Sequence, residues 1–154
     1  CLLKFDLATP YLYFGFGIRQ FGNNISATQT KLLACHKPVK SFSDTFSFAP
    51  FHNIWTNKGC QICWGDLSLP ISVISDYSSY LKDLVNMFFD GEINGDLGVQ
   101  CGPKFSTRSI HYCDYYRRYQ TLTQENPHFI LEPGYLKTCN LNLEQFIKAI
   151  EHDA

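Results

Sequence analysis

The chain has 154 residues, a formal net charge of −1 and 45% hydrophobic residues. This length predicts one domain with a single core, and the composition is globular. A nearly neutral chain has no electrostatic attraction to nucleic acid or anionic lipid, and no apolar run reaches the ~18 residues that span a bilayer. We therefore expect neither a nucleic-acid partner nor a membrane partner.

The cysteines indicate the compartment. There are seven, an odd number with irregular spacing, and a chain of this length can build a core without disulfides. Disulfides belong mainly to oxidising compartments, so we expect a cytoplasmic protein with reduced thiols. Because the first residue is a cysteine and the chain holds one methionine, we also expect the N-terminus to be incomplete.

The first part of the chain is predicted to be an antiparallel meander of strands. Residues 10–21 are aromatic without a helical period, and the turn signal GNN follows them. Residues 28–35 form a candidate second strand. In 42–48, phenylalanines stand at even positions, which is typical of a half-buried strand (Phe42, Phe46 and Phe48).

Helical patterns follow after Pro70. In residues 76–90 the apolar residues recur at i, i+3, i+4 and i+7, which predicts an amphipathic helix. Residues 107–121 are a second candidate helix with tyrosines on one face. Residues 142–150 are a third, in which Asn142 and Gln145 resemble a capping box. Strands followed by helices predict one α+β domain over residues 1–154, with the helices packed on an antiparallel sheet.

The stretch FHNIWTNKGCQICWGDL, residues 51–67, contains several residues that could act in catalysis or bind a metal. Cys60 and Cys63 form half of a structural zinc site, but the remaining ligands would have to come from cysteines and a histidine outside a second C-x-x-C (Cys101, His111 and Cys113). A thioredoxin-like redox pair requires a helix to begin directly after it, and here a Gly-containing turn follows instead.

A third interpretation of this stretch is a nucleophilic cysteine. A thiol that accepts an acyl group needs solvent access and a hydrogen-bond donor aimed at the oxyanion. The Asn53 amide is a suitable donor, and Asn53 and Cys63 lie on connected extended segments that can face each other across the turn expected at 56–59. The alternative is that Asn53 closes a turn and Cys63 is a small buried residue.

Two further patterns have structural explanations. The stretch HYCDYYRRYQ at 111–120 could stack nucleic-acid bases beside Arg117 and Arg118, but the neutral chain favours a helix with a tyrosine face in the core and a solvated charged face. The glycines near residues 15–22 do not match a G-x-G-x-x-G nucleotide motif.

The stretch resembles the active-site segment of ubiquitin-conjugating enzymes, which runs His-Pro-Asn, an aliphatic residue, a turn, and then Gly-x-Ile-Cys-Leu. It is more similar to the prokaryotic branch that contains protein B of the PRTRC plasmid systems, with which it shares Pro50, Asn53, Trp55, Cys63, Trp64 and Gly65. It departs from the family in lacking a proline between His52 and Asn53. Its turn is also longer than usual and contains Cys60.

The resemblance implies a UBC-like fold and a transthiolation reaction. Cys63 would accept a ubiquitin-like protein from an activating enzyme and pass it to a target amine, without a cofactor or metal. Asn53 would support the adjacent loop or the oxyanion, and Asp96, in the loop after the first helix, would assist the incoming lysine. His52 would be a structural residue of the turn.

The resemblance also implies partners. Related prokaryotic operons encode a ubiquitin-like protein, an activating enzyme and a JAB-type deconjugating peptidase, and some act in antiphage defence. Two other readings stay open: a non-catalytic interaction module on the same fold, and a zinc-binding module that uses Cys60 and Cys63.

Overall fold

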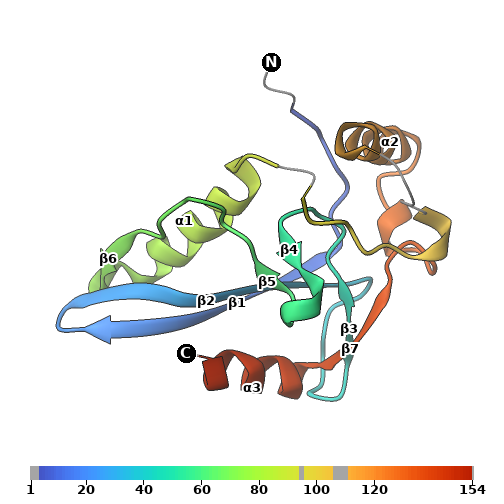
Figure 1. Cartoon of the computed structure of the whole chain (residues 1–154). Coiled ribbons are helices and arrows are strands. Elements are labelled where there is room, and N and C mark those ends of the chain that lie inside the picture. The colour runs from blue at the N-terminus through green and yellow to red at the C-terminus, as the bar shows by residue number, and fades with distance from the viewer. Residues whose placement is uncertain (1–3, 94–95, 106–110, 154) are drawn as a thin grey trace.

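The structure, a computed structural model, describes residues 4–93, 96–105 and 111–153. In these residues the chain forms one antiparallel sheet and three α-helices (Figure 1). The strands are β1 (Tyr11–Phe21), β2 (Asn24–Cys35), β3 (Thr45–Phe48), β4 (Ile54–Trp55), β5 (Gln61–Ile62), β6 (Ile71–Val73) and β7 (Thr138–Asn142). The helices are α1 (Tyr77–Asp90), α2 (Tyr112–Glu125) and α3 (Leu143–Asp153). This mixed arrangement agrees with the predicted α+β class.

Strand β2 organises the sheet. It pairs along its whole length with β1, from Tyr11 opposite Cys35 to Phe21 opposite Asn24. Its other edge pairs in succession with β6, β5 and β3. Strand β4 adds to β5, and β7 adds to β3. The predicted meander is therefore right from β1 to β3 and wrong at the next step, because β4 does not pair with β3; it pairs with β5, which pairs with β2.

Helices α1 and α3 cover opposite faces of the β1–β2 hairpin (Figure 1). A β-bulge beside Gly17 inserts Thr28 into β2, because Gly17 pairs with Gln29 and Ile18 pairs with Ala27. The extra residue turns Ala27 toward α1, so that it packs in one cluster with Tyr80. The bulge thereby gives α1 an apolar surface near the hairpin tip.

The predicted helices are present. The first is confirmed as α1. The second lies partly outside the described residues, since 107–110 are not described, and it extends beyond its predicted end to Glu125. The capping box at the start of α3 is confirmed: Gln145 N–H donates to Asn142 Oδ1 at 2.9 Å, and the Gln145 side chain accepts from Asn142 N–H at 3.0 Å. In the described parts of the chain, no helix is both long and apolar enough to cross a membrane.

The strand predictions need three corrections. Strand β3 begins at Thr45, so Phe42 lies in a loop and is 64% exposed, whereas Phe46 is buried as predicted. Strand β2 begins four residues before its predicted start at 28, because the bulge breaks the alternation there. Strands β6 and β7 were not predicted, since short strands carry little periodicity.

Gly15 on β1 allows α3 to approach the sheet. A Cβ at this position would overlap Ile150 Cδ1 and would lie 2.8 Å from Phe146 Cζ. We expect Gly15→Ala to lower the free energy of unfolding by about 1–3 kcal/mol, the usual cost of overpacking a core. Urea unfolding monitored by tryptophan fluorescence measures this change. Gly98→Ala is the control, because a Cβ there has no neighbour within 4 Å, and equal effects of the two variants would contradict the prediction.

Candidate functional site

The β4–β5 hairpin brings Asn53 and Cys63 together. Ile54 pairs with Ile62 and Trp55 with Gln61 in this hairpin. One step further from the turn, the Cys63 N–H donates to the Asn53 carbonyl oxygen at 2.7 Å. The main chains of the two residues therefore lie opposite each other, and both residues line the same pocket.

The long turn keeps this register because its extra residues are confined to the turn itself. A 3-10 helix (Thr56–Lys58) is followed by Gly59 and Cys60, which have φ angles of 63° and 62°. The Cys60 N–H donates to Trp55 O at 3.1 Å, and the Leu32 N–H donates to Cys60 O at 3.0 Å. The turn is thus closed on β4 and attached to β2.

The two cysteines of the C-x-x-C motif have different environments. Cys60 is 1% exposed within the core, and burial raises the pKa of its thiol to about 12. Cys63 is half-buried and lines a pocket of about 590 Å³. The pocket is bounded by the hairpin, by residues 64–67 and by the end of α1 with the loop that follows it. Only Cys63 of the pair is therefore open to a substrate.

Asn53 connects the hairpin to the loop after α1. Its backbone is left-handed, with φ of 63°, a conformation that asparagine tolerates better than most residues. Its Nδ2 donates to the Glu92 carbonyl oxygen at 2.9 Å. A second pocket, of about 410 Å³, also includes Asn53 and the end of α1, together with residues 4–7 and Tyr116. Asn53 thus lies where two pockets meet.

Asp96 lies further along the same loop. Its side chain is exposed, and it is not among the residues that line either pocket. The carboxylates that line the Cys63 pocket are instead Asp66, Asp90 and Glu92. The role assigned to Asp96 stays a prediction. The other carboxylates have no sequence motif that would have identified them before the fold was known.

Trp64 fixes the segment after Cys63. Its indole Nε1 donates to Thr30 Oγ1 of β2 at 2.7 Å, and its ring lies edge-on to Phe88 of α1, with 6.5 Å between the ring centroids. The cysteine therefore stands between a hairpin attached to β2 and a tryptophan attached to both β2 and α1.

His52 is a buried structural residue. Its ring packs against tyrosines of α2, and its Nδ1 lies 3.2 Å from the Tyr116 hydroxyl, which also accepts from the His52 N–H at 3.1 Å. Burial lowers the pKa of His52 to about 4, so the ring is neutral at physiological pH. A general-base role at neutral pH requires a pKa nearer 7.

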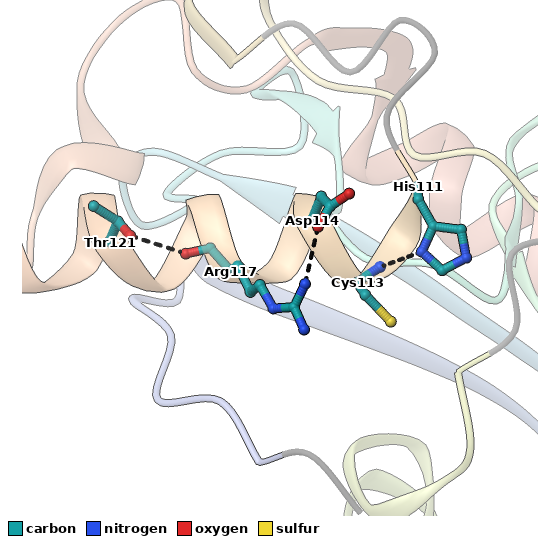
Figure 2. A network of polar contacts seen from close by, with 5 residues as sticks. All are labelled: His111, Cys113, Asp114, Arg117 and Thr121. Carbon is teal, nitrogen blue, oxygen red and sulfur yellow. Dashed lines mark hydrogen bonds and ion pairs between the residues drawn. The ribbon is translucent and has the colours of Figure 1, made fainter. Parts of the chain in front are cut away.

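The tyrosine face of α2 is in the core, as the structural explanation of residues 111–120 predicted (Tyr115, Tyr116 and Tyr119 are all buried). The opposite face is solvated: Figure 2 shows Arg117 paired with Asp114, at 3.0 Å, and the His111 ring accepting from the Cys113 N–H at the start of the helix. Three of the four tyrosines of this stretch are therefore not accessible to stack on bases, and Tyr112 is half-buried.

The zinc interpretation lacks ligands in the described part of the chain. No group of three or more His, Cys, Asp or Glu side chains is placed there to hold a metal ion. Cys101, one of the candidate ligands, lies with its Sγ 3.4 Å from the Tyr115 hydroxyl, and burial raises the pKa of its thiol to about 11.

Comparison with known proteins adds no family to this description. No protein-family model, curated protein or solved structure matches the chain. The function must therefore be inferred from the residues of the site.

The difference between the two cysteines is directly testable. At pH 8 we expect iodoacetamide to alkylate Cys63 in the folded protein much faster than Cys60, since Cys60 is buried and its raised pKa keeps it a thiol. Peptide mapping by mass spectrometry over time measures both rates. In urea the two rates should converge. Equal rates in the folded protein would contradict the assignment of Cys60 to the core.

The buried His52 predicts a pH dependence of stability. Its pKa is about 4 in the folded protein and about 6.5 in an unfolded chain, so the unfolded state binds more protons between these values. The free energy of unfolding should fall as the pH is lowered from 6.5 to 4, by up to about 3 kcal/mol. Urea titrations at several pH values measure it. His52→Phe should flatten this dependence, whereas His128→Gln, at an exposed position, should not.

Proposed function

We propose that the protein is a ubiquitin-conjugating-enzyme-like transferase with a UBC-like fold, and that Cys63 carries a ubiquitin-like protein as a thioester. The observation that carries the proposal is the position of Cys63, half-buried in a pocket and directly opposite Asn53. The resemblance of residues 50–65 to the active-site segment of that family supports it independently of the geometry.

The proposed reaction has two acyl transfers. The Cys63 thiolate attacks the thioester that joins the C-terminal glycine of the ubiquitin-like protein to the activating enzyme; a new C–S bond forms and the thiolate of the activating enzyme leaves. A target amine then attacks the Cys63 thioester, an amide forms, and Cys63 is released while the amine gives up a proton. Both steps pass through a tetrahedral oxyanion that a nearby N–H donor stabilises.

Asn53 has a suitable amide for this role. The amide carries two N–H donors, and the bond to the Glu92 carbonyl uses one of them. We propose that the first N–H holds the loop that carries Asp96 and that the second is offered to the oxyanion on Cys63. Asp96 is proposed to guide the incoming lysine of the target.

A non-catalytic interaction module is the second candidate. The observation that favours it is the bond between Asn53 and Glu92, because an asparagine that only ties a loop to the hairpin needs no reaction at Cys63. In either case we propose a cytoplasmic protein whose partners are a ubiquitin-like protein and an activating enzyme, with a JAB-type peptidase encoded nearby.

The transfer reaction predicts a thiol-sensitive adduct. The protein is incubated with ATP and with the ubiquitin-like protein and activating enzyme encoded beside its gene, then separated on gels with and without reductant. An adduct that reductant removes is expected, and Cys63→Ala should abolish it. Cys113→Ala, at a half-buried position outside both pockets, is the matched control and should leave it unchanged. Folded protein that forms no adduct with active partners would favour the non-catalytic module.

The proposed role of Asn53 predicts which step fails in a variant. Asn53→Asp keeps the shape of the side chain and tolerates the left-handed backbone, but it removes both N–H donors. We expect the discharge of the loaded thioester to hydroxylamine to slow by about 100-fold or more, as for other lost oxyanion donors. Single-turnover gels measure the rate. An unchanged discharge rate would assign Asn53 to loop support alone.

A further inference from the structure

Strand β6 presents apolar side chains to solvent. Ile71 and Val73 are 64% and 42% exposed, whereas Ser72 between them is half-buried. Ser72 pairs with Ile25, which packs against α1, so Ile71 and Val73 lie on the face of the sheet away from α1. This pattern is the reverse of a strand that buries its apolar residues.

Further apolar side chains are exposed near β6. Phe21 at the end of β1 stands in the same row across the sheet as Val73, because both pair with Asn24 of β2. Ile74 and Tyr77, which follow β6 in the chain, are also exposed. We call the outward-facing pair Ile71 and Val73 the β6 surface. The segment from Leu67 to Ser75 contains no charged residue.

The backbone of β6 also has an open edge. The Ile74 N–H donates to Asn23 O at 2.8 Å, and in an antiparallel ladder the next hydrogen-bonded pair lies two residues away, at Ser72 and Ile25. The N–H and C=O groups of Ile71 and Val73 therefore point away from β2. Among the described residues, β6 pairs with no strand other than β2. Proteins usually protect such an edge with charges, proline or a bulge.

We propose that a second copy of this chain covers the β6 surface by antiparallel pairing of β6 with β6 about a two-fold axis at Ser72. This register places Ile71 of each copy opposite Val73 of the other, so the outward-pointing N–H and C=O groups bond reciprocally. It also stacks Ile71 of one copy on Val73 of the partner, on one face. Because Ser72 meets its own copy on the other face, no like charges are brought together.

The contact area makes the dimer a weak one. In this register the side chains that meet the partner are Ile71 and Val73, which are 64% and 42% exposed, so the buried area lies below the ~1,200 Å² of a standard interface and the pairing relies on its main-chain hydrogen bonds. The hairpin and α1 hold both β6 and Phe21 in place, so little ordering accompanies association. We therefore expect a dimer that dissociates at micromolar concentrations.

Sedimentation velocity of the full chain in reductant, from low micromolar to submillimolar concentration, tests the proposal. The mass should rise reversibly from the 17.7 kDa of the monomer to a plateau at twice that value. A mass that stays at 17.7 kDa throughout would overturn the proposal. A mass that rises past the dimer without a plateau would also overturn it, since two-fold pairing is closed.

Two variants test whether the dimer forms through the open edge of β6 or through nonspecific association of exposed apolar side chains. Val73→Pro removes an outward-pointing N–H without breaking a bond to β2, and the φ of Val73, −89°, lies close to the range of proline. Ile71→Lys places a charge on the surface. Each should raise the dissociation constant at least tenfold with unchanged circular dichroism. Ile147→Lys, on the exposed side of α3, is the control; if it weakens the dimer equally, or if both β6 variants dimerise like the wild type, the assignment to β6 is wrong.

Discussion

The length of β2 is the constraint on which the other elements depend. Twelve residues of extended chain span about 40 Å, enough for three short strands to attach along one edge while β1 occupies the other. Strand β5 attaches through the pairing of Lys31 with Gln61 and through the bond from the Leu32 N–H to Cys60. Since β4 pairs only with β5 among the described strands, β2 fixes the position of the whole hairpin, and with it Asn53 and Cys63.

A second constraint acts on the segment that leads into the hairpin. Buried hydroxyls of α2 bind main-chain groups there: Tyr115 donates to Pro50 O at 2.7 Å, and Tyr116 accepts from the His52 N–H. Tyr119, one turn further along the helix, donates to Ala8 O at 2.7 Å and holds the N-terminal segment. A buried carbonyl without a partner is costly, so these tyrosines satisfy irregular backbone and fix its path. The site is thus held from β2 on one side and from α2 on the other.

Sequence patterns predicted the elements in which a regular pattern runs over many residues. They did not predict the short elements that form by pairing with distant parts of the chain. The apolar stripe of α1 and the capping box of α3 are local signals, so both helices were found. Strand β6 has only three residues and exposes its apolar side chains, which no alternation rule anticipates. The opposition of Asn53 and Cys63 followed from a hairpin hypothesis, but the bond from Asn53 to Glu92 joins residues 39 positions apart and required the fold.

In the β4–β5 hairpin, the length of the turn is independent of the spacing between the two site residues. The residues of the turn sit at one end of a short ladder, and Asn53 and Cys63 sit at the other. Chain length at the turn can therefore change without altering the spacing of the two site residues, provided that the Cys60 side chain remains anchored in the core. Thr56–Lys58, with Lys58 over the Trp55 ring at 4.3 Å, is the part left to vary. A change in this turn would therefore alter the surface beside the site while leaving the spacing of Asn53 and Cys63 unchanged, so under the proposed function recognition and chemistry could diverge independently in evolution.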